Sequence, residues 1–367
     1  MVKFADLIEQ HQEELFILEA LNAGKLLHLN KIIDIPAAIN FLHYYAGAAD
    51  KIHGQTLKCS VAPALAAGCT MIVKPAEKTP LPALYYANLA KEAGIPDGVL
   101  NVITGFGPTA GAAICSHMDV DAVNIALYLS CVLMLLLFTG STEVGRLVVQ
   151  AAARSNRKPV SLELGGKCPL IIFSDADVNM AVDIAKKAIF YNKVKFVWLG
   201  PVFLCMKEYM KSSLRRLLKV LKAGLLETLL IQTLIKDLRS MGINSRRFFG
   251  ISIMEDTLIA KEEIFGPVMS LRKFKTIEET IEKANNTIYG LAAGILTNDL
   301  NTANRVSRLI RAGVIWINCY STFDRDCPYG GYKASGFGRD LGLQALEKLS
   351  AREDCDHPYL WFPLAVT

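Results

Sequence analysis

The sequence predicts an α/β protein with a doubly wound parallel sheet, extended into two domains. Short apolar runs bounded by glycine or proline, such as Thr70–Val73 and Gly98–Gly105, alternate with segments of helical periodicity at residues 5–23 and 82–94. This alternation of strands and helices is typical of sheets covered by helices on both faces. With 367 residues, the chain is long enough for two such domains.

Composition argues against several classes of partner. The net charge is +5 and hydrophobic residues make up 52% of the chain. One basic cluster, Lys211–Lys222, fits either a helix that binds nucleic acid or a membrane surface, or an amphipathic helix with a solvated basic face. No aromatic stacking platform accompanies it, so we expect the solvated face and no nucleic-acid partner.

Cysteine usage and the N-terminal segment favour the cytoplasm. The nine cysteines form no CxxC pair and no zinc-finger spacing with histidine. We therefore expect free thiols in a reducing compartment and no bound metal. Residues 1–10 carry charges every few positions and no apolar core, which argues against a signal peptide.

Two stretches lack the regular pattern. Ile125–Phe138 contains 14 residues without a charge. A membrane-spanning helix needs about 20 apolar residues, so we interpret this stretch as a buried strand with an apolar insert at about 125–137 and expect no membrane span. Residues 203–260 show no clear punctuation, and no elements are assigned there.

The segment Phe138–Gly145 predicts a phosphate-binding turn. It follows a predicted strand and opens a helix, with Gly140 allowing a tight turn and Gly145 allowing the helix to pack close to the sheet. The N–H groups of the first helical turn, beside Ser141, would then point at a phosphate. On local grounds alone, a strand–helix turn without a ligand is an equal alternative.

Two charged residues follow the strand that ends at Val73. Lys74 and Glu77 are placed to hydrogen-bond the two hydroxyls of an adenosine ribose, and the carboxylate would repel a 2′-phosphate. This pair therefore favours NAD over NADP. The alternative is an exposed surface pair.

Glu163 is the one acidic residue in an apolar strand that ends at Gly165 and Gly166. Desolvation raises the pKa of a carboxyl group in such a setting, which suits a general base. The alternative is a structural glutamate held in a salt bridge.

Five segments occur in one order: KPAEKTP, FTGSTEVG, LELGGK, EEIFGPV and PYGGYKASGFGR. Together they resemble the aldehyde dehydrogenase superfamily, and specifically its cytosolic, plant-type members. The resemblance covers residues 1–58, 61–124, 138–193 and 261–345. It implies a Rossmann-like NAD-binding domain at 1–165, an α/β catalytic domain at 166–345 and a C-terminal arm at 346–367.

The resemblance also implies a reaction. In this family a cysteine thiolate attacks the aldehyde, hydride passes to the nicotinamide of NAD(P), and a glutamate activates water to release the acid. Carried over by position, Glu163 is the general base. The implied cofactor-binding residues are Lys74, Glu77, Gly107, Pro108, Gly140, Ser141, Gly145, Glu263 and Phe265, and the implied substrate-pocket residues are Asn318, Phe323 and Tyr329.

Two catalytic groups of the family are absent from the sequence. The nucleophilic cysteine falls on Val197 in an ungapped comparison, which leaves the nucleophile unassigned. Cys205 is the nearest thiol, and Cys168, Cys319 and Cys327 lie close to motifs; we expect all four to be ordinary thiols. A block near residues 59–60 is missing, and with it the asparagine that stabilises the oxyanion.

The functional expectation is thus an enzyme that oxidises an aldehyde to a carboxylic acid with NAD, with impaired activity. The alternatives are a pseudoenzyme that binds NAD or an intact paralogue without turnover, and a gene relic that does not fold stably. Phe323 and Tyr329 suit an aromatic aldehyde such as a hydroxycinnamaldehyde. We expect at most a weakened homo-oligomer, because the missing block carries an interface element of the family.

Overall fold

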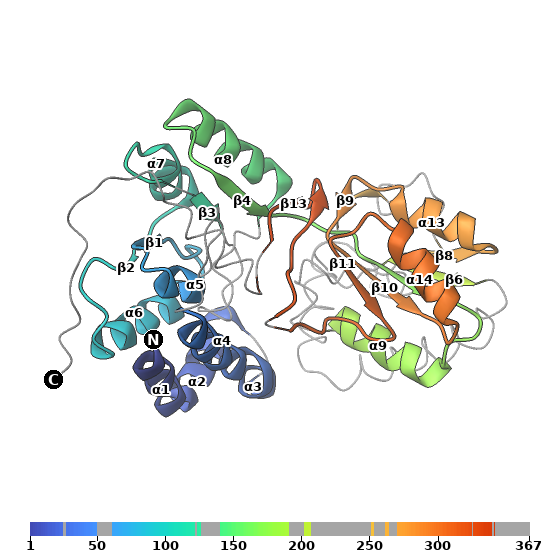
Figure 1. Cartoon of the computed structure of the whole chain (residues 1–367), viewed down its shortest axis with the longest axis horizontal. Coiled ribbons are helices and arrows are strands. Elements are labelled where there is room, and N and C mark those ends of the chain that lie inside the picture. The colour runs from blue at the N-terminus through green and yellow to red at the C-terminus, as the bar shows by residue number, and fades with distance from the viewer. Residues whose placement is uncertain are drawn as a thin grey trace, which may run out of the picture.

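The protein, described here by a computed structural model, has two lobes joined through a short sheet (Figure 1). The structure describes residues 1–24, 27–49, 61–121, 123–125, 140–190, 202–206, 251–252, 261–263, 270–324, 326–339 and 341. Several predictions fall outside these ranges: the apolar insert except Ile125, the junction at 59–60, the basic cluster Lys211–Lys222, Val197, Phe265 and the arm at 346–367.

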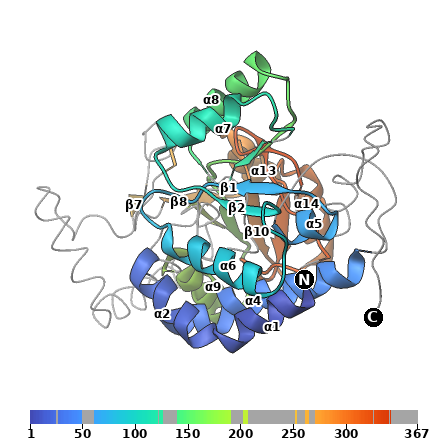
Figure 2. The ribbon, with the colours of Figure 1, turned by 90° about the vertical axis from the view of Figure 1, so that its left-hand side faces the viewer.

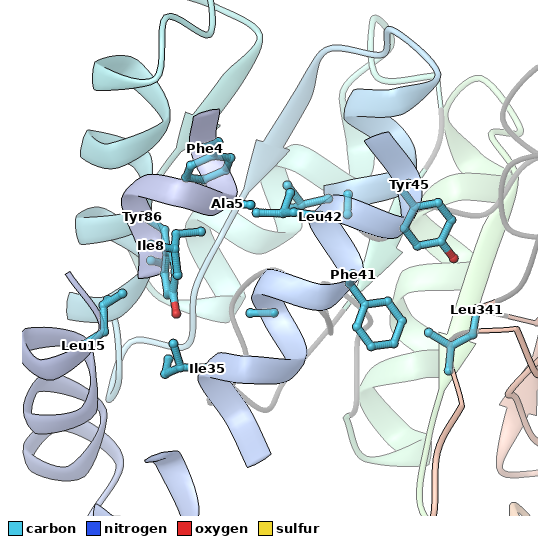
Figure 3. Packing of buried hydrophobic residues seen from close by; sticks show 14 of the residues in the cluster. Phe4, Ala5, Ile8, Leu15, Ile35, Phe41, Leu42, Tyr45, Tyr86 and Leu341 are labelled. Atoms are coloured by element: carbon cyan, nitrogen blue, oxygen red, sulfur yellow. The ribbon is translucent and has the colours of Figure 1, made fainter. Parts of the chain in front are cut away.

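The first lobe begins with a group of helices. In order they are α1 (Val2–Gln10), α2 (Gln12–Ala23), α3 (Leu27–Leu29), the π-helix η1 (Asn30–Asp34), α4 (Ile35–Ala48) and α5 (Val61–Ala66). The helical stretch expected at 5–23 is divided at His11, whose φ of −98° and ψ of 16° depart from helical values. This break lets Phe4 and Ile8 of α1 and Leu15 of α2 enter one core (Figure 3).

A two-stranded parallel pair follows these helices. Strands β1 (Met71–Val73) and β2 (Leu100–Val102) pair in register, with α6 (Leu81–Glu92) as the crossover between them. They match the strands and the helix predicted from residues 70–105. In Figure 2 this pair lies between α6 on one side and α7 (Ala112–Ser116) on the other; the π-helix η2 (Gly107–Gly111) runs directly into α7.

A three-stranded sheet joins the lobes. Strand β4 (Val160–Glu163) pairs in parallel with β3 (Val123–Ile125) and in antiparallel fashion with β13 (Gly336–Phe337). Helix α8 (Thr142–Arg154) precedes β4. The chain therefore crosses to the second lobe through residues 164–168 and returns near its C-terminus to complete this sheet (Figure 1). The domain boundary predicted at 165 falls within this crossing and remains a prediction.

The second lobe contains a six-stranded, wholly parallel sheet in the order β11-β10-β5-β6-β8-β7. Its strands are β5 (Pro169–Ile172), β6 (Val202–Met206), β7 (Ile251–Ser252), β8 (Ser270–Phe274), β10 (Ala292–Leu296) and β11 (Val314–Ile317). The short strands β9 (Tyr289–Gly290) and β12 (Tyr332–Lys333) form a separate antiparallel pair. Strand β6 occupies the middle of the sheet, although all of it except Val202 lies in the stretch 203–260, where the sequence predicts no element.

Helices cover both faces of this parallel sheet. Leu170 and Ile172 of β5 pack with α9 (Val178–Phe190), whereas Ile171 of β5 packs in a cluster with α13 (Ile277–Asn285) and α14 (Leu300–Leu309). Successive residues of a strand point to opposite faces, so both faces of β5 are buried. The doubly wound α/β fold predicted from the sequence is confirmed.

The largest hydrophobic core connects distant parts of the chain. It combines α1, α2, α4 and α6 with Leu291, Trp316, Tyr329 and Leu341 from the C-terminal half. In Figure 3, Leu341 lies beside Phe41 and Tyr45 of α4. The N-terminal helices thus help to hold the second lobe against the first.

Candidate functional site

Lys74 and Glu77 form a pair at the end of β1. The Lys74 Nζ and Glu77 Oε2 atoms are 3.8 Å apart, and Nζ also donates to the Pro75 carbonyl oxygen at 2.8 Å. The lysine side chain is 15% exposed and the glutamate side chain 44%. The lysine is therefore held in place by its own loop while the carboxylate faces solvent, where a ribose hydroxyl could reach it.

The turn that begins at Gly107 and Pro108 borders this lysine. Both residues are exposed at the start of η2. At the other end of η2, a Cβ on Gly111 would lie 3.6 Å from Lys74 Cδ. The far end of the helical turn that starts at Gly107 therefore lies next to Lys74, the residue predicted to bind the ribose.

Helix α8 presents its N-terminus at the junction of the lobes. Ser141 is the N-cap, and its Oγ accepts a hydrogen bond from Val144 N at 3.2 Å. Gly140 is buried, and its N–H donates to the Glu163 carbonyl oxygen at 3.2 Å. The first turn of a helix offers unpaired N–H groups and a partial positive charge, which together favour an anion.

Gly145 permits close contact between α8 and the residue after β4. A Cβ at this position would lie 2.7 Å from Leu164 Cδ2 and 2.9 Å from its Cδ1. Ordinary carbon contacts lie at about 3.5–4.0 Å, so any larger residue would push the helix outward. The close packing that the sequence predicted at Gly145 is what the structure shows.

Glu163 is the last residue of β4 and is 4% exposed. Its strand is braced by β13, because Glu163 pairs with Gly336 and Leu164 N donates to the Ser335 carbonyl oxygen at 2.9 Å. Gly336 has a φ of +108°, and a Cβ there would lie 2.0 Å from the Leu162 carbonyl oxygen. The segment PYGGYKASGFGR therefore fixes the end of the strand that carries the predicted base.

Glu263 comes from a segment distant in sequence and lies against the Gly165–Gly166 turn. Its Oε1 accepts a hydrogen bond from Gly166 N at 2.9 Å. A Cβ on Gly165 would lie 2.2 Å from Oε2, so only glycine leaves room for this carboxylate. Burial raises the pKa of Glu263 to about 7, opposed by the Gly166 hydrogen bond and by Lys167.

The predicted substrate-pocket residues divide into two groups. Asn318 has a φ of +53° and its amide bridges the backbone of Thr297, accepting from Thr297 N at 3.1 Å and donating to Thr297 O at 2.9 Å. Phe323 and Tyr329 instead stack edge-to-face at 5.3 Å, and Trp316 lies 5.7 Å from Phe323. The two rings lie in an aromatic cluster at the edge of the largest core, whereas the Asn318 side chain braces the ends of β10 and β11.

The described thiols near the motifs differ in exposure. Cys205 lies on β6, is 4% exposed, and burial raises its pKa to about 12. Cys168 is 1% exposed within the largest core. Cys319 is partly exposed and Cys327 is exposed. A nucleophile must be a thiolate, so Cys205 has the wrong protonation state and the wrong surroundings for attack on an aldehyde.

Three contacts unite the predicted base with part of the predicted cofactor site. Gly140 bonds to Glu163, Gly145 packs on Leu164, and the following turn holds Glu263. Lys74, Glu77 and the turn at Gly107 form a second group on the first lobe. Sequence reasoning missed the supporting roles of Lys167, Ser335 and Gly336, although all three lie in the quoted motifs.

Comparison with known proteins identifies the family. A model of the aldehyde dehydrogenase family matches residues 1–61, 57–224 and 251–353. The chain belongs to the aldehyde dehydrogenase family. It is 47% identical over 408 residues to aldehyde dehydrogenase family 2 member C4 of Arabidopsis thaliana, covering 94% of this chain and 79% of that protein. It is 42% identical to aldehyde dehydrogenase 1 of Tanacetum cinerariifolium, covering 95% and 79%.

Solved aldehyde dehydrogenase structures share the fold. The aldehyde dehydrogenase KauB of Pseudomonas aeruginosa superposes with a TM-score of 0.82 at 32% identity, covering 95% of this chain and 81% of that chain. An indole-3-acetaldehyde dehydrogenase of P. syringae, in complex with NAD+, also gives a TM-score of 0.82, at 33% identity and with the same coverage. The family identifies the chain as an oxidoreductase of the aldehyde dehydrogenase type.

The comparison also locates differences within the family. The alignment to the Arabidopsis protein spans 408 residues, more than the 367 of this chain, so the relative carries internal residues that this chain lacks. The family model matches in three segments: the first two overlap at residues 57–61, and the last two are separated by residues 225–250. In the described part of this family member, no helix is long and apolar enough to cross a membrane, and no three His, Cys, Asp or Glu side chains gather to hold a metal.

Proposed function

We propose that this protein binds NAD at the junction of its lobes and oxidises an aldehyde to a carboxylic acid with strongly impaired turnover. The observation that carries the proposal is the contact between the Gly165–Gly166 turn and Glu263, directly after the strand that ends in Glu163. This contact supports the proposal because Glu163, the proposed base, precedes the stretch 164–166, and the last residue of that stretch bonds to Glu263, the proposed ligand of the cofactor.

The residues present fit NAD. The capped N-terminus of α8 offers N–H groups for the pyrophosphate, and Gly145 lets that helix lie against Leu164. Lys74 and Glu77 offer a donor and an acceptor for the adenosine ribose hydroxyls, beside Gly107 and Pro108. Glu263, with Phe265 two residues on, would hold the nicotinamide ribose and ring.

When bound, NAD supplies the hydride acceptor for aldehyde oxidation. Glu163 would take a proton from the water that releases the acid, and at 4% exposed its side chain is largely shielded from bulk solvent. The half-buried ring of Phe323, packed on the buried ring of Tyr329, would offer apolar surface to an aromatic aldehyde. A positioned general base contributes about 10²–10⁴-fold to a rate, which accounts for only part of an enzyme's acceleration.

Impairment follows from two losses in the sequence. Val197 stands at the position of the family nucleophile, and the block that carries the oxyanion asparagine is missing near residues 59–60. Loss of an oxyanion donor alone costs about 3–4 kcal/mol of transition-state stabilisation. Activated cysteines have pKa values lowered toward neutrality, whereas that of Cys205 is raised to about 12.

A second candidate function is an NAD-binding pseudoenzyme, free or paired with an intact paralogue. The burial of Cys205 and Cys168 favours it, since neither thiol is placed to replace the nucleophile. Relatives include proteins named cytosolic and proteins named mitochondrial, and our proposal places this chain in the cytoplasm. A weakened homo-oligomer is part of the same proposal.

The test is calorimetric titration of the full chain with NAD, followed by an NADH-forming assay with a hydroxycinnamaldehyde on the same sample. We expect micromolar binding with slow turnover; binding with no turnover selects the pseudoenzyme. Lys74→Met should weaken NAD binding, whereas Lys91→Met, whose ammonium lies 3.2 Å from Asp97 at an exposed site, should not. A folded chain that binds no NAD would refute both candidates, and a chain without a cooperative thermal transition would be a relic.

A further inference from the structure

Lys167 directly follows the turn that holds Glu263, and it is buried without a place in the proposed chemistry. It is 4% exposed, in the loop between β4 and β5. Its Nζ donates to the Glu262 carbonyl oxygen at 2.6 Å, while the preceding Gly166 N donates to Glu263 Oε1 at 2.9 Å. Two consecutive residues of the loop thus hold two consecutive residues of a segment about a hundred positions away.

We propose that Lys167 is a positioning residue that fixes the Glu263 carboxylate for its contact with the nicotinamide ribose. The inference rests on the proposed function, since it assigns Glu263 to the cofactor. The two hydrogen bonds act at different atoms, one on the backbone of Glu262 and one on the side chain of Glu263. Together they fix both the position of the segment and the direction of the carboxylate.

The charges around the pair support this role. Burial, together with the charge of Arg272, lowers the pKa of Lys167 to about 8, against the opposing effect of Glu263 and Glu262. The lysine therefore remains mostly protonated at neutral pH and attracts Glu263, whose own pKa is raised to about 7 mainly by burial. Among the described residues, Tyr289 also lies near this pair, and its pKa is raised first by burial and then by Glu263 and Glu262.

An ammonium suits this position better than an apolar side chain of the same length. It supplies a charge-assisted donor to a carbonyl oxygen, a bond stronger than one between neutral groups. It also favours the ionised form of a carboxylate that burial would otherwise protonate. A methionine at 167 would fill the space, leave the Glu262 carbonyl oxygen without this donor, and let Glu263 protonate at a higher pH.

The first measurement needs no cofactor. The carboxyl titration of Glu263 is followed by infrared spectroscopy in the full chain, with its band identified by subtraction of Glu263→Gln. We expect Lys167→Met to move the midpoint up by about one pH unit and Lys167→Arg to restore it, because arginine keeps the charge. Lys283→Met is the matched control, since that ammonium also donates to a backbone carbonyl, Lys273 O at 2.7 Å, but lies on α13.

The second measurement is the dissociation constant of NAD by calorimetry at pH 6, 7 and 8. Loss of one charge-assisted bond corresponds to about a tenfold higher dissociation constant for Lys167→Met, with partial rescue by Lys167→Arg and no change for Lys283→Met. The pH at which affinity falls should move up together with the carboxyl midpoint. A purely structural lysine would lower the unfolding midpoint without moving either pH profile.

The outcomes separate this inference from the proposed function. An unchanged Glu263 midpoint in a folded Lys167→Met protein would overturn the positioning role, whatever NAD does. If Lys167→Met shifts the Glu263 midpoint but the wild-type protein binds no NAD, the proposed function is overturned and only the effect of Lys167 on Glu263 remains. A shifted midpoint with tenfold weaker NAD binding supports both.

Discussion

Gly145 and Gly47 offer one chemical change with opposite expected results. Both are helical glycines, in α8 and in α4, and each can be replaced by alanine. A Cβ at Gly145 would meet Leu164 Cδ2 at 2.7 Å, whereas a Cβ at Gly47 meets nothing within 4 Å. The pair therefore tests whether close packing of α8, rather than helix propensity, decides the effect.

The expected changes in stability follow from two opposing effects, helix propensity and overpacking. Alanine stabilises a helix interior relative to glycine by up to about 1 kcal/mol. At Gly145 this gain opposes an overpacking cost of about 1–3 kcal/mol, because Leu164 is 5% exposed, packs with Leu162 and has little room to yield. We expect Gly145→Ala to destabilise the protein by about 1 kcal/mol and Gly47→Ala to stabilise it by about 0.5 kcal/mol, less than the full gain because Gly47 is near the end of α4.

The same change at Gly145 should weaken NAD binding. Restoring an ordinary carbon contact moves α8 outward by about 1 Å, and the capped N-terminus moves with it. Interactions of an anion with a helix terminus are worth up to about 2 kcal/mol, so we expect a dissociation constant about tenfold higher for Gly145→Ala and an unchanged one for Gly47→Ala.

Urea unfolding of both variants measures the change in the free energy of unfolding, and calorimetric titration measures the dissociation constant of NAD. Equal unfolding slopes in the variants and the wild type would justify comparing the midpoints directly. The reasoning would be refuted by a Gly145→Ala protein at least as stable as Gly47→Ala, or by one that binds NAD as tightly as the wild type does.

Four further predictions concern other groups. Lys158 is 4% exposed, and its Nζ donates to Cys115 O, His117 O and Ser155 Oγ at 2.8–2.9 Å. Lys158→Met should therefore lower the free energy of unfolding, measured by urea titration, by about 2 kcal/mol. An unchanged free energy of unfolding would mean that these three bonds make no net contribution to stability. Alkylation at pH 8 with peptide mapping should label Cys327 and spare Cys205, and early labelling of Cys205 would contradict its burial. Because the pKa of Glu263 is raised from 4.5 to about 7, the folded protein holds a proton on this carboxyl between these pH values that the unfolded chain has lost. As the pH rises toward 7, the free energy of unfolding should therefore fall, while the affinity for NAD should rise because the carboxylate becomes ionised. Glu263→Gln should remove both trends. Val197→Cys should restore a thiol at the position of the family nucleophile. Turnover should nevertheless stay about 10²–10³-fold below that of an intact enzyme, because the asparagine that stabilises the oxyanion is still missing. Full activity of this variant in a single-turnover assay would show that the missing asparagine does not limit catalysis.

Local motifs were the predictable part of this molecule. The strands at Met71–Val73 and Leu100–Val102, the helix that begins after Ser141 and the strand that ends at Glu163 all follow from apolar runs bounded by glycine, proline or a capping residue. In each case the determining residues are neighbours in sequence. The α/β class follows from their alternation.

Contacts between distant segments were not predictable in the same way. The burial of Lys167 depends on its contact with Glu262 and Glu263, which lie about a hundred residues further along the chain, and the sequence around Lys167 does not predict that contact. The break at His11 is likewise set by the core that α1 and α2 share. Strand β6 was missed although two local signals point to it: Gly200-Pro201 directly before it is a turn signal, and the five consecutive apolar residues Val202–Met206 are a strand signal.

The same distinction explains why cofactor binding can outlast catalysis in such a chain. Lys74 with Glu77, and Ser141 with Gly145, are each built within a few residues, so damage elsewhere leaves their local geometry intact. Catalysis instead requires a nucleophile, an oxyanion donor and a base to converge on one atom, and these groups act as a unit rather than additively. In the function proposed above, the missing cysteine already removes the covalent step, so the missing asparagine costs little more. Glu163 survives in a strand that β13 holds for structural reasons as well, because its backbone pairs with Gly336 and accepts from Gly140.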